Sequence, residues 1–330
     1  MVRIAVSILT LMLATSSVVR INCFRHQRLQ FNAQFTRLMS GASGSQAKRQ
    51  RIERIISNRG VGSRKEVQKL LKQGRVKVNG KLVRSSSEQF PSDCVVEVDE
   101  EEIVAVPLLA LYHKPVGVVS TMNDGKWRRE SLQQLQEDFP FLKTMHPVGR
   151  LDMDTSGLLL FSSNGQLTNA LLHPNTGVER EYEAIVAHEV ENDSLAKVLE
   201  AGVKTTLGEF SARLLESKVL EQRVSIPKSL LAQNEDDDNL DKEGREVRTS
   251  IDDGGDEEEE VGCSYVRVMV KEGKYRMVRR ILHNAGHSVI NLHRVRYGNI
   301  VLDEELEEGG VIPCSVDHSQ WARTLGSFKQ

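Results

Sequence analysis

The chain has 330 residues and a mass of 37.0 kDa, with 39% hydrophobic and 27% charged residues, which is enough for two domains with cores of their own. Its four cysteines lie far apart and form no C-x-x-C pair. This argues against a disulfide framework or a thiolate zinc site and favours a reducing compartment. The net charge of −2 is the sum of regions with strong and opposite charge.

Three segments carry most of that charge. Residues 1–46 contain five arginines and no acid, residues 47–90 have a net charge of +10, and residues 235–260 have a net charge of −11. The basic segment suits a polyanion such as RNA, although a run of charges can also be a solvated face. The acidic segment has few apolar residues, so we expect a disordered insertion at about 233–260.

The N-terminus is typical of a targeting sequence. Residues 4–19 form an apolar stretch interrupted by Ser and Thr, and it is shorter and more polar than the roughly 20 apolar residues of a membrane span. We expect residues 1–46 to be an organellar leader, with the plastid favoured over the mitochondrion because the apolar block resembles a signal-peptide core. A membrane anchor at 4–19 is the alternative, and the mature protein is expected to have no stable membrane association.

Residues 51–84 are predicted to form two helices followed by a hairpin. Three isoleucines before residue 57 have helical spacing, and Ser63 with Glu66 forms a capping box that starts a second helix. Asn79-Gly80 lies between short apolar alternations and predicts a type I′ turn. The unit carries five cations that can meet RNA phosphates without reading sequence: Arg64, Lys65, Lys69, Lys72 and Arg75.

The pattern GSRKEVQKLLKQGRVKVNGKLV resembles the S4 RNA-binding domain. A generic helix and hairpin scaffold is the alternative. On this resemblance we expect an S4 domain at 47–98, followed by an acidic linker at 99–107. From Leu108 onward strand-like runs dominate and helical stretches are fewer, which predicts an α+β catalytic domain over 108–320 with a mixed, mainly antiparallel sheet. The helices predicted there are 131–137, 166–172, 194–201 and 275–285.

The segment HPVGRLDMDTSGLLLFSSNG places polar residues directly before a buried apolar run. Polar residues at the mouth of a strand often form sites, although the same residue types form ordinary turns. GRLDMDTSGLLLF is similar to the G-R-L-D-x-x-T-x-G-L-L signature of pseudouridine synthases. The resemblance implies that Asp152 is the catalytic carboxylate and that Arg150 fills the gap left by an extruded base.

Two further segments resemble later motifs of the same family. REYEAIV implies that Tyr182 stacks on the target base and takes part in proton transfer. KEGKYRMVRRILHNAGHSVINLHRVRYGNIVL implies that Arg279 is the basic partner of Asp152 and that Val278 packs against the uracil. An arginine held against Asp152 would lower the pKa of that carboxyl. Basic residues near the site are expected to contact RNA: Arg150, Lys274, Arg276 and Arg280.

The order of an S4-like domain, GRLD, HPNTGVEREY and HRVRYGNI resembles the RsuA, RluB, RluE and RluF branch of pseudouridine synthases, and is most similar to the RluB type. This implies isomerisation of a uridine in ribosomal RNA, with the large subunit favoured, by a monomer whose partners are ribosomal RNA and pre-ribosomal particles. No cofactor is expected, because neither a phosphate loop nor a G-x-G-x-x-G motif occurs. No metal is expected either, because His283 and His287 have the spacing of a ligand pair but no third ligand is evident. The alternative is a non-catalytic S4-type ribosome-assembly protein, against which the presence of Asp152, Tyr182 and Arg279 argues.

Overall fold

The computed structural model describes residues 49–59, 61–92, 94–103, 106–122, 130–232 and 257–327. The expected leader at 1–46 and residues 233–256 of the expected insertion lie outside these residues. Contacts within the chain define a smaller unit with Met1–Pro107, Gln134–Thr144 and Gly310–Ser315, and a larger unit with Leu108–Gln133, Met145–Gly309 and Val316–Gln330.

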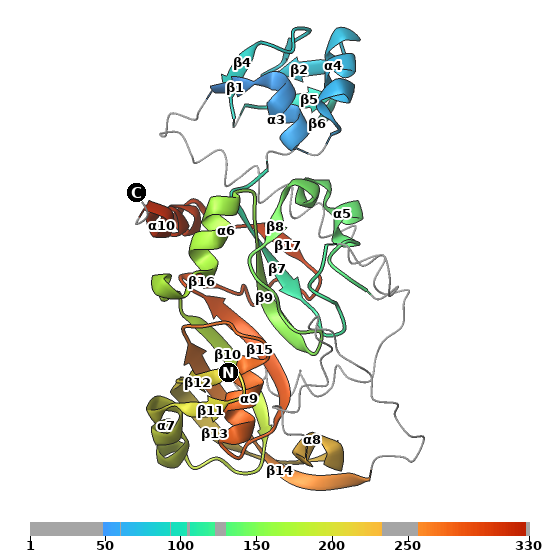
Figure 1. The fold of residues 1–330 in the computed structure, drawn as a ribbon. Helices are drawn as coiled ribbons and strands as arrows, with labels where there is room; N and C mark the ends of the chain where they lie inside the picture. Colours follow the sequence, from blue (N-terminus) through green and yellow to red (C-terminus); the bar gives the residue numbers. More distant parts are fainter. Residues whose placement is uncertain are drawn as a thin grey trace. The chain divides into compact units, whose positions relative to one another are not determined.

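In the smaller unit a short strand precedes two helices, which lead into a small sheet (Figure 1). Its elements are β1 (Arg49–Arg51), α3 (Ile52–Asn58), α4 (Arg64–Lys72), β2 (Val76–Val78), β3 (Lys81–Leu82), β4 (Gln89–Pro91), β5 (Val96–Val98), β6 (Glu101–Glu102), α5 (Leu135–Asp138), η2 (Pro140–Thr144) and β17 (Val311–Pro313). The capping box is present, because Ser63 and Glu66 each bind the other's backbone N–H. Asn79 and Gly80 have φ of 50° and 75°, which confirms the predicted turn.

The core of this unit forms where α3 and α4 pack on the sheet with order β3-β2-β5-β6. Arg59, buried at the end of α3, donates hydrogen bonds to the carbonyl oxygens of Ser92, Cys94 and Ile103. These bonds connect the end of α3 to the chain before and after β5. The segment expected to be a linker contains β6, which pairs with β5, so the ordered sheet extends past residue 98.

The larger unit is built on a curved sheet with the strand order β13-β14-β10-β15-β9-β7 (Figure 1). Its strands are β7 (Leu109–Lys114), β8 (His146–Pro147), β9 (Thr155–Ser162), β10 (Arg180–Ala187), β13 (Arg213–Pro227), β14 (Glu258–Val270), β15 (Val289–Tyr297) and β16 (Ile300–Val301), with β11 (Val203–Thr205) and β12 (Gly208–Phe210) as a separate hairpin. The pairs are antiparallel except for β9 with β15, which run parallel. The expectation of an α+β fold with a mixed, mainly antiparallel sheet is confirmed.

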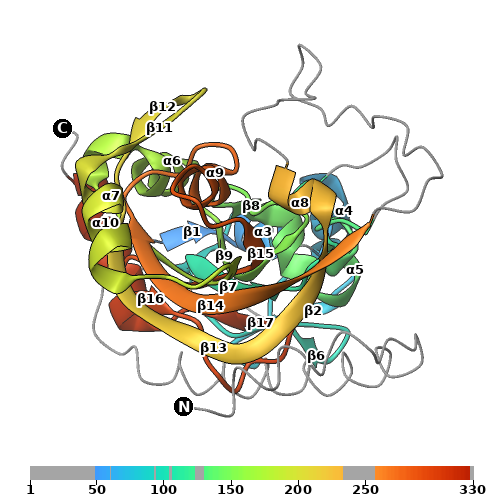
Figure 2. The ribbon, with the colours of Figure 1, turned by 90° about the horizontal axis from the view of Figure 1, so that it is seen from below.

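Helices cover parts of this sheet, and α9 lies on one face beside the β11–β12 hairpin (Figure 2). The helical elements are α6 (Gly165–Leu172), η3 (Pro174–Thr176), α7 (Asn192–Ala201), α8 (Lys228–Ala232), α9 (Met277–Asn284) and α10 (Val316–Ser327). Three predicted helices are found with ends within two residues of the expected ones. The prediction at 131–137 is wrong at its start, because Ser131 forms a β-bridge with Val119 and only Leu135–Asp138 is helical. No helix in the described ranges is long and apolar enough to cross a membrane.

Strands β13 and β14 form a long ribbon at one edge of the sheet. Glu258–Glu260 were expected to belong to the disordered insertion, but they are the first residues of β14 and pair with Ser225–Pro227 of β13. Ile226 and Val261 pack with Ala187 in a small apolar cluster there. This burial explains how a strand can begin within an acidic run.

Candidate active site

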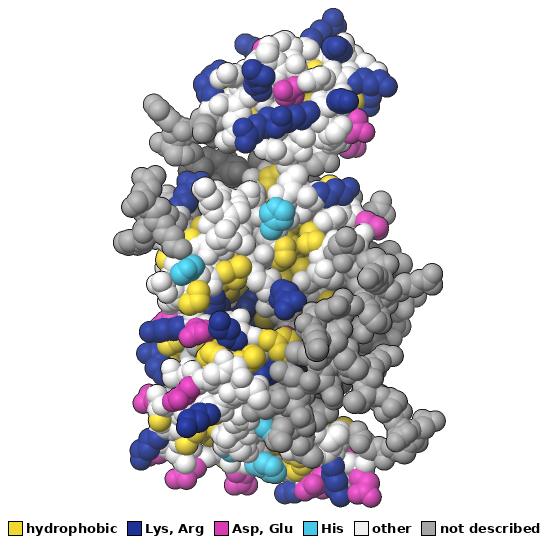
Figure 3. All heavy atoms as spheres, in the orientation of Figure 1, with side chains coloured by type: hydrophobic (Ala, Val, Ile, Leu, Met, Phe, Trp, Pro, Cys, Tyr) yellow, Lys and Arg dark blue, Asp and Glu magenta, His cyan; other side chains and the backbone are white. Residues whose placement is uncertain are grey.

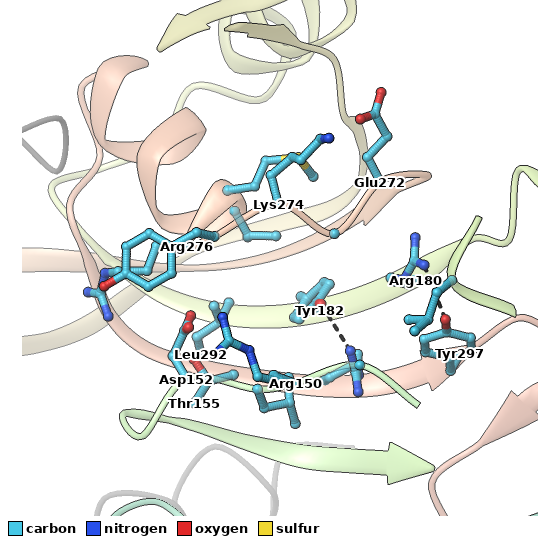
Figure 4. Close-up of a pocket in the computed structure, with 18 of the residues that line it drawn as sticks. Arg150, Asp152, Thr155, Arg180, Tyr182, Glu272, Lys274, Arg276, Leu292 and Tyr297 are labelled. Atoms are coloured by element: carbon cyan, nitrogen blue, oxygen red, sulfur yellow. Dashed lines mark hydrogen bonds between the residues drawn. The ribbon is translucent and has the colours of Figure 1, made fainter. Parts of the chain in front are cut away.

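A cavity of about 360 Å³ lies where β9, β10 and β15 meet the loop before α9. Asp152 and Arg276 lie at one end of it, Arg180 and Tyr297 at the other, and Tyr182 between them (Figure 4). Six of the residues expected from sequence line this one cavity: Arg150, Asp152, Tyr182, Lys274, Arg276 and Val278. Charged, aromatic and aliphatic groups therefore converge on one cavity, as they do in ligand-binding sites.

The loop that carries Asp152 is fixed through its backbone. Ser120 donates from its hydroxyl to the carbonyl oxygen of Leu151 (2.6 Å) and accepts from the Leu151 N–H (3.1 Å). The ammonium of Lys114 donates to the carbonyl oxygens of Asp152 (3.1 Å) and Thr155 (2.9 Å). Burial lowers the pKa of Lys114 to about 8, although the neighbouring carboxylates oppose the change. The loop backbone is thus held by two side chains, with Ser120 bonded to Leu151 and Lys114 bonded to Asp152.

Two arginines bind this loop by pairing with the carboxylate of Asp154. Arg276 lies 3.0 Å from the Asp154 carboxylate and has a left-handed φ of 47°, a conformation that costs a non-glycine residue about 1–3 kcal/mol. Arg279 is buried, lies 3.2 Å from the same carboxylate, and donates to the Asp154 carbonyl oxygen at 2.9 Å. The sequence predicted Asp152 as the partner of Arg279, whereas the structure places Arg279 against Asp154, outside the residues that line the cavity.

The carboxyl group of Asp152 has a raised pKa. Burial is the main cause, and the charge of Asp154 adds to it, while Arg276, Arg279 and Arg150 act in the opposite direction. The arginines lower this pKa as expected, but the desolvation of the carboxylate outweighs their three positive charges, so the net change is upward. A carboxylate with a raised pKa is a stronger base than an exposed one.

One predicted RNA contact is contradicted. Arg280 is 1% exposed, donates to the Thr206 hydroxyl at 2.8 Å and lies over the Tyr275 ring. It points from α9 toward the β11–β12 hairpin, so its guanidinium cannot reach RNA without leaving these partners. Lys274 is exposed at the cavity.

In the smaller unit, the cations expected to bind RNA are at the surface, where Lys and Arg side chains are spread over the face drawn in Figure 3. Lys65, Lys69 and Lys72 are exposed on α4, as is Arg64. Arg75 forms a two-pronged ion pair with Asp99, with 2.6 Å between its Nε and a carboxylate oxygen. Because Asp99 already neutralises it, Arg75 offers RNA less positive charge than the α4 cations do.

Sequence reasoning missed a buried stack that underlies Tyr182. The Arg294 guanidinium lies over the rings of both Tyr182 and Tyr297, 5.9 and 5.2 Å from their centroids, and the Arg180 guanidinium lies over the Tyr297 ring at 4.9 Å. Strand alternation could have placed Arg180 on the face of Tyr182, since the two residues are two apart. Regular alternation along β15 would not place Arg294 and Tyr297 on one face, because they are three residues apart; an irregularity in the strand brings them together.

Two family models match the chain. The model described as RNA pseudouridylate synthase matches residues 109–284, and the S4 domain model matches residues 50–92. The chain therefore belongs to the family of RNA pseudouridylate synthases, carries an S4 RNA-binding domain, and binds RNA as that combination implies. The resemblance stated from the motifs is confirmed.

Relatives place the chain within that family. Ribosomal large subunit pseudouridine synthase B of Vibrio vulnificus (strain CMCP6) is 31% identical over 287 residues, which cover 84% of this chain and 75% of the relative. The protein with the same description in Bacillus subtilis (strain 168) is 31% identical over 249 residues, which cover 75% and 85%. An uncharacterized RNA pseudouridine synthase of Aquifex aeolicus (strain VF5) is 28% identical over 260 residues, which cover 78% and 90%.

Proposed function

We propose that this protein converts one uridine to pseudouridine in the RNA of the large ribosomal subunit, with Asp152 as the catalytic carboxylate. The observation that carries the proposal is the cavity in which Asp152, with its raised pKa, lies beside Tyr182 and Arg276. The names of the Vibrio and Bacillus relatives support the large subunit as the source of the RNA.

The geometry suits a base that has left its helix. A uridine inside a duplex exposes neither its glycosidic bond nor C5 to a carboxylate in a cavity, so the nucleotide is extruded at a cost of a few kcal/mol. Tyr182 then offers a ring to the uracil and Val278 an apolar contact, since both line the cavity. Arg150 is exposed at its edge and is placed to fill the vacated position in the RNA.

The chemistry needs a carboxylate of the kind found at position 152. Isomerisation breaks the N1–C1′ bond and joins C1′ to C5, with no net oxidation or reduction. A desolvated Asp152 is activated as a nucleophile or base relative to a carboxylate in water. The arginines held by Asp154 keep positive charge near it, which favours the ionised form that either role requires.

The proposed setting is a bacterial-type organellar ribosome, in the plastid rather than the mitochondrion. It rests on the acid-free, arginine-containing residues 1–46 and on the bacterial ribosomal enzymes among the relatives. A fusion of residues 1–50 to a fluorescent reporter is expected to enter plastids. A reporter confined to the cytosol would refute the organellar setting while leaving the reaction untouched.

The reaction is tested with Asp152→Asn, which keeps the side-chain volume and removes the charge. Wild-type protein and variant are incubated with transcripts of organellar large-subunit and small-subunit ribosomal RNA, and pseudouridine is mapped at single turnover. We expect conversion of one large-subunit uridine by the wild type, RNA binding without conversion by Asp152→Asn, and full activity for the exposed control Asp193→Asn.

Each outcome has a distinct meaning. Turnover well above background by folded Asp152→Asn would refute the assignment of the carboxylate. Conversion confined to the small-subunit transcript would refute the substrate, and no conversion in either transcript by folded wild-type protein would refute the proposed reaction on ribosomal RNA.

A further inference from the structure

The feature behind this inference is a β-bulge in β15. Glu181 of β10 lies opposite Arg296, but the next residue, Tyr182, lies opposite Arg294, so Val295 is an extra residue with no counterpart. In a regular strand Arg294 and Arg296 would share a face. The bulge instead turns Arg296 to the far face, where it pairs with Glu181 at 2.8 Å, and leaves Arg294 beneath Tyr182.

Arg294 lines the cavity and is held there by two side-chain hydrogen bonds. It is 3% exposed, its Nε donates to the Leu158 carbonyl oxygen at 2.7 Å, and its Nη1 lies 3.4 Å from the Tyr182 hydroxyl oxygen. Its Nη2 has no hydrogen-bond partner within the described residues. Gly157 on the neighbouring strand allows the close approach, because a Cβ there would overlap the backbone of Arg294.

A guanidinium has donors and no acceptor. The Tyr182 oxygen must therefore accept in its contact with Arg294, and its own O–H remains to donate elsewhere. Tyr182 and Arg294 both line the cavity, so a Tyr182 O–H that turns away from Arg294 can donate to a ligand bound there.

We propose that Arg294 is a positioning residue: it fixes the Tyr182 ring from below and holds the hydroxyl oxygen as an acceptor, so that the Tyr182 O–H is directed to the RNA in the cavity. The proposal rests on the proposed function, in which Tyr182 faces the target uridine. It predicts that Arg294 affects the reaction through Tyr182 alone.

A double-mutant cycle tests this coupling in the full chain, with a large-subunit transcript that the wild type modifies. Arg294→Gln is expected to lower the single-turnover rate roughly 10- to 100-fold, as loss of a hydrogen bond to a charged group does, with the Kd for RNA unchanged. In a Tyr182→Phe background the same substitution should add little, because its target is already gone. Arg294→Lys keeps a cation that cannot reach both Leu158 and Tyr182, and should recover part of the rate.

The matched control is Arg296→Gln, on the same strand but on the opposite face. It should leave the rate within about 3-fold in both backgrounds, as independent sites do. Additive effects of Arg294→Gln and Tyr182→Phe, or an equal loss of rate for Arg296→Gln, would overturn the proposal.

A second measurement does not depend on turnover. The chain has five tyrosines, so the carbon-13 ring signal of Tyr182 is assigned by its loss in Tyr182→Phe. That signal should shift and its ring flipping should accelerate in Arg294→Gln but not in Arg296→Gln. An unchanged Tyr182 signal in folded Arg294→Gln would overturn the positioning role even if the protein modified no ribosomal RNA, whereas failure of the proposed function alone would leave this shift intact.

Discussion

Replacing Lys114 by methionine is expected to remove a pH dependence of stability above pH 8. Burial lowers the pKa of Lys114 from its ordinary 10.5 to about 8. Below pH 8 the lysine is protonated in both the folded and the unfolded chain, and the folded chain carries the full cost of the buried charge. Between pH 8 and 10.5 the unfolded chain binds one proton more than the folded chain, so the free energy of unfolding rises with pH.

The size of this rise follows from the two pKa values. Each tenfold change in a dissociation constant corresponds to about 1.4 kcal/mol, so Lys114 contributes a rise of roughly 3 kcal/mol across this range. Lys114→Met removes the charge and therefore the rise. The same substitution also removes the bonds to the carbonyl oxygens of Asp152 and Thr155, so the variant should lose activity even at a pH where it is folded.

The assay is urea unfolding of wild type and variant at a series of pH values from 7 to 10, with the difference in unfolding free energy plotted against pH. We expect Lys114→Met to lose stability relative to the wild type as the pH rises. The exposed Lys197 of α7 provides the control, because Lys197→Met should give a flat difference. A flat difference for Lys114→Met as well would show that Lys114 is not buried as a charge and would refute the reasoning.

Three further results are expected. Gly157→Ala should cost several kcal/mol, measured as a lower urea midpoint, because its Cβ would overlap the β15 backbone at a left-handed φ of 103°; Gly165→Ala, with open space around it, should be tolerated, and equal costs would contradict the clash. Ser63→Ala should destabilise the S4 domain by about 1 kcal/mol through loss of the cap on α4, and an unchanged midpoint would mean that the cap adds nothing. Lys69→Gln and Lys72→Gln should each reduce the slope of log K for RNA against log salt by roughly 0.7–0.9, and slopes equal to the wild type would remove α4 from the RNA-binding surface.

Most of the structure of the S4 domain could be predicted from local signals in the sequence. The capping box at Ser63 and the Asn79-Gly80 turn act over three or four residues, so the chain needs no distant contact to obey them. The start of β14 was missed for the opposite reason. In the sequence Glu258 is part of an acidic run. Its strand forms because it pairs with β13 and packs in a small apolar cluster, and these partners are more than thirty residues away in the sequence.

In the candidate site, the motifs predicted residues that line the cavity but not which side chains form contacts with one another. Arg279 and Arg280 are adjacent on α9, so they point about 100° apart, one toward Asp154 and the other toward the β11–β12 hairpin. Nothing in the sequence near residue 295 marks the bulge that places Arg294 under Tyr182. The raised pKa of Asp152 likewise depends on burial by the whole fold.

The open end of the β13–β14 ribbon is joined by a bond from the Lys228 backbone N–H to the Glu257 carbonyl oxygen (2.9 Å) and by an ion pair between the side chains of the same residues (2.8 Å). The residues between Ala232 and Glu257 therefore join two positions whose distance is already set by the pairing of β13 with β14. Because the ribbon itself holds the two ends together, the fold should tolerate a change in the length of this stretch; loop-closure entropy changes by only about 0.6 kcal/mol for each doubling of length. The same latitude is open to the experimenter: a fluorescent protein or an affinity handle placed between residues 240 and 250 would report on the enzyme without altering either terminus.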